Sequence, residues 1–280
     1  MILSVASGKG GTGKTTIAVN LALSLAKTQP IQFLDCDVEE PNAHFFLKPH
    51  LVTNRVVSIP VPEIIEEKCT YCGKCAEVCA YHALAVLKDT VLVFRELCHG
   101  CGGCSLLCPE KAVKERGQRI GVMEFGSSNG IEFIHGKLDI GQAMSPPLIR
   151  ELKKNMDPTK QVIIDVPPGT SCPMVEAVKG SDFSLLVTEP TPFSLNDLKL
   201  SAETLKEMRI PFGVVINRAG VGDSGVEDYC RKERIPLLMT VPLDRDIAVA
   251  YSEGIPLVEA IPDYREKFIE LLARVQELKK

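Results

Sequence analysis

The sequence predicts an α/β fold in which a mostly parallel sheet is flanked by helices and the chain is interrupted by a separate cysteine-rich module. Three features lead to this prediction. Short apolar runs alternate with amphipathic stretches, which is typical of βαβ units. A glycine-rich loop stands between the first apolar run and the first amphipathic stretch. Eight of the eleven cysteines lie between Cys69 and Cys108, where the alternation breaks.

The expected strands and helices follow one another in regular order. Each strand is a short apolar run, and each helix is a longer stretch whose apolar residues recur at helical spacing. The expected strands are residues 2–6, 31–35, 161–165, 182–189, 212–217 and 236–242. The expected helices are residues 14–27, 145–156, 194–208, 225–234 and 263–280. Such alternation predicts a mostly parallel sheet covered on both faces.

The regular alternation stops between Ile59 and Glu115. We therefore expect one parent α/β domain, residues 1–58 and 116–280, that carries an inserted cysteine-rich module of residues 59–115. The proline- and acid-rich stretch 58–68 before the cysteines is expected to be a linker. The stretch 117–141 after them contains an Asn-Gly turn signal, so we expect either a hairpin or an irregular return to the parent domain.

The composition excludes several classes of function. A formal net charge of −4 leaves no basic excess to neutralise phosphates, so no nucleic-acid partner is expected. No apolar run approaches the roughly 18 residues that span a bilayer, and the N-terminus lacks the features of a signal peptide. We therefore expect a cytoplasmic protein, in which clustered cysteines bind metal more readily than they form disulfides.

The stretch GKGGTGKT matches the phosphate-binding pattern G-x-x-x-x-G-K-[ST] at every fixed position. It follows an expected strand and opens an expected helix, which is the context that this motif needs. Glycines let backbone N–H groups surround phosphate oxygens, and the helix N-terminus adds partial positive charge. Lys14 is expected to reach the β- and γ-phosphates of ATP, and the Thr15 hydroxyl to bind Mg²⁺. The expected nucleotide-binding residues of the loop are Gly8, Lys9, Gly10, Gly11, Thr12, Gly13, Lys14, Thr15 and Thr16.

Polar residues follow several of the expected strands. Asp35 and Asp37 come at the end of residues 31–35, and Asp165 ends residues 161–165. Ligands of open parallel sheets bind at this edge of the sheet, so we expect these acids beside the phosphate loop. An acid at the end of a strand also serves as a cap or turn residue, and Asn217 is open to the same interpretation.

The cysteine module contains an internal repeat. Adding 29 to the numbers of its first four cysteines gives the numbers of its second four, and the same offset relates Ala83 to Ala112. The two runs are Cys69, Cys72, Cys75 and Cys79, and Cys98, Cys101, Cys104 and Cys108. This coincidence predicts a duplication in which two similar units pack as one.

The spacing C-x₂-C-x₂-C-x₃-C, present twice, predicts two 4Fe–4S clusters. In bacterial two-cluster ferredoxins the fourth cysteine of each run ligates the other cluster. One cluster is therefore expected on Cys69, Cys72, Cys75 and Cys108, and the other on Cys79, Cys98, Cys101 and Cys104. Zinc is the alternative metal, although structural zinc sites combine two cysteine pairs from separate loops. The clusters either transfer electrons or act as staples for a module with little core of its own.

A second loop lysine, Lys9, together with DCD at residues 35–37 and VIIDVPPG at residues 162–169, resembles the deviant Walker A ATPases. That group includes MinD, ParA, Mrp and the nitrogenase iron protein. The resemblance implies Mg²⁺-dependent ATP hydrolysis in a dimer, in which Lys9 reaches the phosphates bound by the other subunit. It implies that Asp37 positions the attacking water near Mg²⁺ and that Asp165 holds Mg²⁺ through water. It further implies that Asn217 hydrogen-bonds adenine and that the backbone at Pro242 flanks the base.

Over nearly the whole chain, the motifs together resemble MinD-superfamily ATPases with an inserted ferredoxin domain. This resemblance implies a homodimer, or a heterodimer with a paralogue, that forms on ATP and acts with a redox or cofactor-assembly partner protein. Two functions remain open. In the first, ATP hydrolysis is coupled to iron–sulfur electron transfer or to metallocluster assembly. In the second, the chain is a positioning or scaffolding switch of the MinD/ParA kind, and the clusters are sensors or staples.

Two further features each admit two interpretations. Cys172 lies seven residues after Asp165 and is either a packed or exposed thiol, or a metal ligand like the cysteine of the nitrogenase iron protein. The C-terminal stretch 263–280 gathers apolar residues on one face. MinD proteins end in a membrane-binding helix, but the acidic residues of this stretch favour packing against the sheet.

Overall fold

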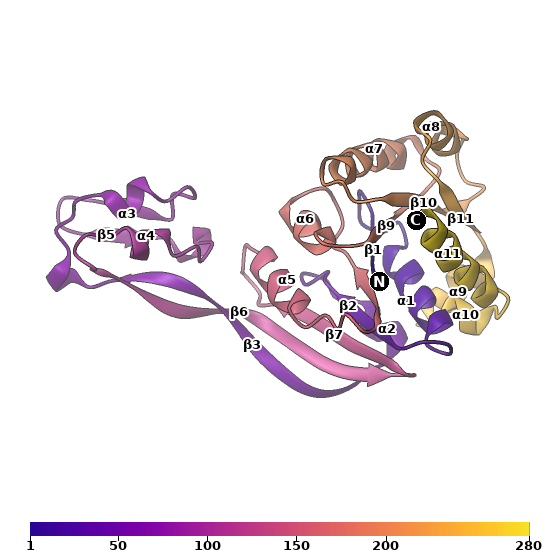
Figure 1. Ribbon diagram of the computed structural model, residues 1–280, viewed down its shortest axis with the longest axis horizontal. Helices are drawn as coiled ribbons and strands as arrows, with labels where there is room; N and C mark the ends of the chain where they lie inside the picture. The colour runs from indigo at the N-terminus through magenta and orange to yellow at the C-terminus, as the bar shows by residue number, and fades with distance from the viewer. Residues whose placement is uncertain (280) are drawn as a thin grey trace. The chain divides into compact units, whose positions relative to one another are not determined.

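The structure is a computed structural model that describes residues 1–279. The chain forms two compact units, each built from separate segments (Figure 1). The first unit consists of Met1–Asn54, Met123–Lys137 and Ile149–Lys280. The second consists of Arg55–Val122 and Leu138–Leu148.

A nine-stranded sheet has the strand order β11-β10-β9-β1-β8-β2-β7-β6-β3. Neighbouring strands from β11 to β7 run parallel, which confirms the mostly parallel sheet. In the register of β2 against β8, Asp35 lies beside Asp165, so two acids meet at the carboxyl edge. The strands are β1 Ile2–Ala6, β2 Ile31–Asp35, β3 His50–Ile64, β6 Val113–Ser128, β7 Ile131–Leu138, β8 Gln161–Asp165, β9 Phe183–Thr188, β10 Phe212–Ala219 and β11 Leu237–Pro242.

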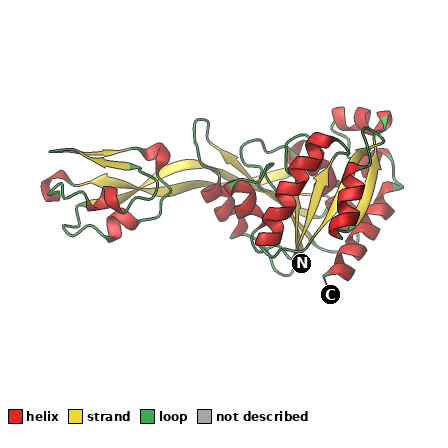
Figure 2. Ribbon diagram, turned by 90° about the horizontal axis from the view of Figure 1, so that it is seen from above, coloured by secondary structure: helices red, strands yellow, loops and turns green. Residues whose placement is uncertain are grey.

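Helices flank the sheet of the first unit, with α1, α10 and α11 on one side and α5, α6 and α7 on the other (Figures 1 and 2). Each expected helix is present, although several are shorter than the sequence pattern. The helices are α1 Lys14–Leu25, α2 Ala43–Leu47, α5 Pro146–Lys153, α6 Cys172–Val178, α7 Pro192–Glu207, α8 Gly225–Glu233, α9 Arg245–Ser252, α10 Leu257–Ala260 and α11 Tyr264–Leu278.

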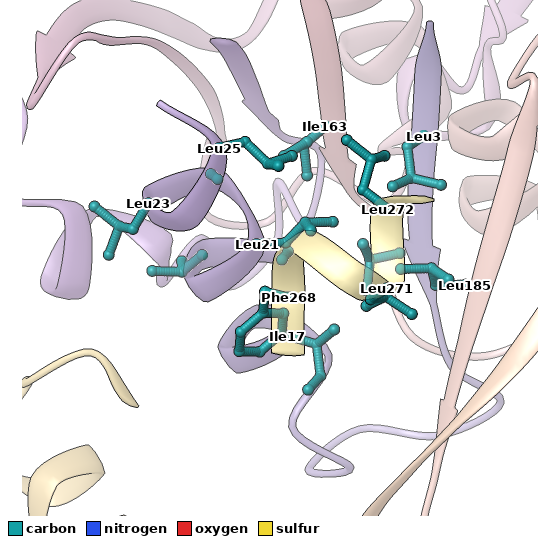
Figure 3. Packing of buried hydrophobic residues seen from close by; sticks show 14 of the residues in the cluster. Leu3, Ile17, Leu21, Leu23, Leu25, Ile163, Leu185, Phe268, Leu271 and Leu272 are labelled. Atoms are coloured by element: carbon teal, nitrogen blue, oxygen red, sulfur yellow. The ribbon is translucent and has the colours of Figure 1, made fainter. Parts of the chain in front are cut away.

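The C-terminal helix α11 packs into the core, as the acidic residues of its stretch predict. Its Phe268 and Leu271 belong to one buried cluster with Ile17 and Leu21 of α1 and with Leu3 of β1 (Figure 3). Burial of such side chains stabilises the fold by about 1.5–3 kcal/mol each. None of the helices within residues 1–279 is long and apolar enough to cross a membrane. The end of the expected helix at residue 280 lies outside the described residues.

The segments that flank the cysteines are strands. Residues 117–141 form the expected hairpin, because β6 and β7 are neighbours joined by Asn129 and Gly130, whose φ angles are +50° and +81°. The expected linker 58–68 is wrong for residues 58–64, which belong to β3. Val57, Ile59 and Val61 are buried alternately along that strand. Its prolines are compatible with a strand because β3 lies at the edge of the sheet.

The second unit contains the repeat as two copies of one backbone arrangement. Its other elements are η1 Glu66–Lys68, α3 Lys74–Glu77, β4 Leu84–Val86, β5 Val91–Val93, η2 Arg95–Leu97 and α4 Gly103–Leu106. The offset of 29 converts η1 into η2 and α3 into α4. It also relates two hydrogen bonds, from Ile65 N to Ala112 O at 2.7 Å and from Phe94 N to Ala83 O at 2.9 Å. The repeat in the sequence is therefore a structural duplication.

Candidate functional site

The phosphate loop joins β1 to α1 and depends on its glycines. Gly11 and Gly13 have φ angles of +79° and +89°, a conformation that other residues rarely adopt. A Cβ atom on Gly8 would lie 2.3 Å from the Asp197 carbonyl oxygen, and one on Gly13 would lie 2.1 Å from Nδ2 of Asn217. Any side chain at these two positions would collide with its neighbour. Because α1 begins at Lys14, the open N-terminus of the helix faces the loop.

Lys14 and Thr15 converge on the acids of the neighbouring strands. The Lys14 amine lies 3.2 Å from Oδ1 of Asp165 and 3.4 Å from Oδ2 of Asp37. The Thr15 hydroxyl donates a 2.6 Å hydrogen bond to Oδ2 of Asp165. The structure therefore brings together the phosphate-loop cation, the hydroxyl and both carboxylates that the sequence selects for phosphate and Mg²⁺.

The charges of this group shift one another's pKa values. Burial alone lowers the pKa of Lys14, but the charges of Asp165 and Asp37 outweigh it and hold that pKa above its ordinary value. Burial raises the pKa of Asp37 to about 6, although the adjacent Lys14 opposes the shift. The ammonium group is thus held charged between carboxylates, as an ATP-binding lysine requires.

Asp35, at the end of β2, accepts hydrogen bonds from the backbone of the loop that follows. It is fully buried, and its two oxygens accept hydrogen bonds of 3.1 Å from the backbone N–H groups of Asp37 and Ala43. Burial raises its pKa well above the usual range, and the charge of Asp165 adds to that shift. Asp35 therefore shapes the loop that carries Asp37.

A cavity of about 250 Å³ adjoins the loop. Lys14, Thr15 and Asp37 line one part of it, and Asn217 and Pro242 line another. The Asn217 side-chain amide donates a 2.8 Å hydrogen bond to the Thr12 carbonyl, so it also fixes the phosphate loop. The cavity has the size and the polar groups of a small-ligand site.

Sequence analysis missed two aromatic residues of this cavity. Phe46 of α2 and Tyr251 of α9 both line it, with their ring centroids 5.1 Å apart. Neither residue belongs to a motif, and the two are far apart in the sequence. Only their packing in the fold brings them together.

Lys9 occupies a different place from Lys14. It is absent from the residues that line the cavity, and its amine lies 3.5 Å from Oε2 of Glu189. Its side chain is about one third exposed. Within this chain, therefore, Lys9 does not join the residues around Lys14.

The cysteines of the second unit surround two separate cavities. One cavity is lined by Cys69, Cys72, Cys75 and Cys108, which we call the first cysteine site. The other is lined by Cys79, Cys98, Cys101 and Cys104, which we call the second cysteine site. Each site thus combines three cysteines of one run with the fourth cysteine of the other run, which is the arrangement that two cubane clusters need. All eight are free thiols.

Matching backbone contacts support both cysteine sites. The Ala83 N–H donates to Sγ of Cys79 at 3.3 Å, and the Ala112 N–H donates to Sγ of Cys108 at 3.2 Å. Hydrogen bonds to sulfur are among the contacts that tune iron–sulfur ligands. Among residues 1–279, no group of three or more His, Cys, Asp or Glu side chains is arranged around a single metal ion. The four thiols of each site line one cavity.

The remaining cysteines lie apart from these sites. Cys36 and Cys230 are buried, in agreement with packing roles. Cys172 is exposed at the first position of α6, after the loop that follows Asp165. This exposure excludes a packed thiol and agrees with an exposed one, and the metal-ligand interpretation stays a prediction.

A parallel sheet with a glycine loop at its carboxyl edge, and a lysine held between two strand-end acids, defines a P-loop nucleotide-binding protein. The family described as the CobQ/CobB/MinD/ParA nucleotide binding domain matches residues 3–257. The chain belongs to this family.

Known relatives and solved structures agree with this assignment. An uncharacterized protein of Methanocaldococcus jannaschii is 33% identical over 258 residues, which cover 91% of this chain and 90% of the relative. An iron-sulfur cluster carrier protein of Pyrococcus abyssi is 25% identical over 302 residues, covering 99% of this chain and 87% of the relative. The structure of the septum site-determining protein MinD of Pyrococcus horikoshii with Mg-ADP has a TM-score of 0.63 at 21% identity. It covers 99% of this chain and 96% of its own, and it shows the shared fold.

Proposed function

We propose that this protein is a Mg²⁺-dependent ATPase that dimerises on ATP and couples hydrolysis to iron–sulfur electron transfer or to metallocluster assembly. One observation carries the proposal: a single chain contains both the Lys14 nucleotide site and two cavities lined by four cysteines each. Residues 59–115 would form the inserted ferredoxin-like domain, and residues 1–58 and 116–280 the ATPase domain. The similarity to an iron-sulfur cluster carrier protein supports the link to iron–sulfur chemistry.

The residues around the cavity have defined roles in this proposal. Lys14 and the backbone N–H groups of the loop bind the phosphates and stabilise the charge that develops on them. Thr15, Asp37 and Asp165 would hold Mg²⁺, which neutralises phosphate charge when bound. Asp37 orients the attacking water. Lys9 leaves Glu189 and reaches the phosphates of the other subunit in the dimer.

The base end of the cavity and the cysteine sites complete the assignment. Asn217 binds adenine, and the backbone at Pro242 flanks it. The eight cysteines would hold two 4Fe–4S clusters, which supply one-electron transfer when bound. The partner is a redox or cofactor-assembly protein, no nucleic acid or membrane takes part, and the protein acts in the cytoplasm.

The proposal is tested by the dependence of ATP turnover on the state of the cysteine sites. Protein reconstituted with iron and sulfide under anaerobic conditions is assayed for ATPase activity after oxidation and after reduction with dithionite. We expect the nucleotide affinity of the two states to differ, because coupling between two sites is reciprocal in binding free energy, and we expect the two turnover rates to differ as well. Equal rates in both states, together with equal nucleotide affinity, would count against the coupling.

The second candidate is a positioning or scaffolding ATPase of the MinD/ParA kind. It is favoured by the fold shared with MinD over 99% of this chain. In that case the cysteine sites would be structural or redox-sensing, and ATP would control assembly on a scaffold. Unchanged turnover on reduction, combined with loss of the folded module when iron is removed, would select this candidate.

A further inference from the structure

The duplication makes the two cysteine sites directly comparable, because every position in one has a counterpart 29 residues away in the other. The backbones of the two loops match: Tyr71 and Gly100 have φ angles of +55° and +64°, and Gly73 and Gly102 have +82° and +74°. Backbone N–H groups point at sulfur in both sites, and the bonds to Cys108 and Cys79 are one matching pair. Side chains and burial, in contrast, differ between the two sites.

Charged side chains are distributed unequally between the two cavities. Glu115 lines the second cysteine site, whereas its counterpart in the repeat, Val86, lines the first. Conversely, Lys74 lines the first site, and its counterpart Gly103 has no side chain. The first site also contains Glu110, which offsets the charge of Lys74. Counting these lysine and glutamate side chains, the first site is balanced and the second carries one negative charge.

Glu115 lies close to the sulfur ligands of the second site. A Cβ atom built on Gly102 would be 2.9 Å from Oε1 of Glu115. Gly102 lies between Cys101 and Cys104 in the loop that supplies three thiols of this site. The carboxylate therefore lies beside the ligand loop, although the Glu115 residue is exposed to solvent.

Burial acts in the same direction as charge. Cys98 of the second site is 9% exposed and buried, whereas its counterpart in the first site, Cys69, is partly exposed. An added electron makes a loaded site more negative. Low-dielectric surroundings and a nearby carboxylate both disfavour that negative charge, while a nearby ammonium group favours it.

We propose that the two cysteine sites are redox-inequivalent: the first site receives the first electron, and Glu115 is the residue that lowers the reduction potential of the second. This inference rests on the proposed function, because it requires 4Fe–4S clusters in both sites. The step transfers one electron from a low-potential one-electron donor to a loaded site, and it breaks no bond and moves no proton. Glu115 acts on the site through its charge and is not a ligand.

The test is a redox titration of the anaerobically reconstituted protein with dithionite, followed by EPR. The variants Cys72→Ser and Cys101→Ser assign each signal, since each removes a thiol from one site only. In the parent protein we expect the first-site signal to develop before the second-site signal. In Glu115→Gln we expect the midpoint of the second site to shift upward, with a much smaller shift at the first.

Two further measurements separate a charge effect from a structural one. The upward shift should shrink as ionic strength rises, because Glu115 is solvent-exposed and screened by salt. Lys74→Met should instead lower the midpoint of the first site. Glu96→Gln makes the same charge change as Glu115→Gln in the same unit, but Glu96 does not line either cavity. It should therefore shift both midpoints less than Glu115→Gln shifts that of the second site.

The possible failures are distinguishable. A second site that is reduced first, or a Glu115→Gln midpoint equal to that of the parent protein, overturns this inference and leaves the proposed function intact. An iron and sulfide content below two clusters per chain overturns the proposed function, and this inference with it.

Discussion

At the scale of single residues, Lys14 carries the proposed ATPase activity. Its amine lies between Asp165 and Asp37. We predict that Lys14→Ala lowers the ATPase rate about 10²-fold or more, because it removes a preorganised cation from the transferring phosphate. Lys27→Ala is the matched control, since Lys27 is exposed just beyond the end of the same helix. Turnover within a few-fold of the parent rate in Lys14→Ala would contradict the assignment.

Asp37 is predicted to make stability depend on pH. Its pKa rises from an ordinary value of 3.8 to about 6 on folding, so the folded state binds its proton more tightly than the unfolded state. The resulting stabilisation is complete below about pH 4 and is lost as pH rises through about 6. The nucleotide-free parent protein should therefore lose stability relative to Asp37→Asn between pH 5 and pH 7. Urea unfolding of both proteins measures this difference, and a constant difference across that range would refute it.

The sequence alone predicted the site residues that belong to motifs with a fixed spacing along the chain. The phosphate loop and the two cysteine runs are local patterns, so the convergence of Lys14 and Thr15 on Asp165 could be anticipated. The role of Asp35 could not, because its carboxylate binds backbone N–H groups of a loop that has no signature. Phe46 and Tyr251 were missed because only tertiary packing joins them.

At the scale of elements, one lysine fixes α5 to α6. The Lys153 amine donates hydrogen bonds of 2.8 Å to the carbonyls of Glu176 and Ala177 near the end of α6, and another to Lys179 O. We predict that Lys153→Met destabilises the protein by about 1–3 kcal/mol, because carbonyls at the end of α6 lose their partner. Urea unfolding measures the loss. Lys154→Met is the control. Lys154 is exposed and, among the described residues, pairs only with Glu151, so its replacement should cost little stability.

The β6–β7 hairpin depends on its turn. Gly130 has a φ of +81°, where an L side chain is strained. We predict that Gly130→Ala lowers the free energy of unfolding by about 1 kcal/mol. Gly117 lies within β6 and has no positive φ, and a Cβ atom there would meet only Ser58 at 3.8 Å, so Gly117→Ala should be close to neutral. Equal effects of the two substitutions would contradict this interpretation of the turn.

The edge strand β3 shows why a strand can be mistaken for a linker in the sequence. Its prolines and acids resemble a linker, yet Val57, Ile59 and Val61 alternate as a strand requires. The strand signal in the sequence is weak because an edge strand pairs with only one neighbour and tolerates prolines, which lack an N–H group. The helices of the first unit were easier to predict, since their apolar periodicity extends over several turns.

At the scale of the whole molecule, the chain passes between the two units four times. Two of these passages lie within continuous strands, at Asn54–Arg55 in β3 and at Val122–Met123 in β6. The third and fourth are at Lys137–Leu138, where β7 ends, and at Leu148–Ile149 within α5. The unit with the cysteine sites is thus connected to the unit with the nucleotide site through regular structure at each passage. Such connections are compatible with coupling between the sites, which must be measured directly.

The most direct test of the central claim is whether ATP changes the reduction potential of a cysteine site. The reconstituted parent protein and Lys14→Ala are titrated with dithionite and followed by EPR, with and without ATP and Mg²⁺. We predict that ATP shifts the midpoint of at least one site in the parent protein and of neither site in Lys14→Ala. Identical midpoints with and without bound ATP in the parent protein would contradict coupling between nucleotide and electrons.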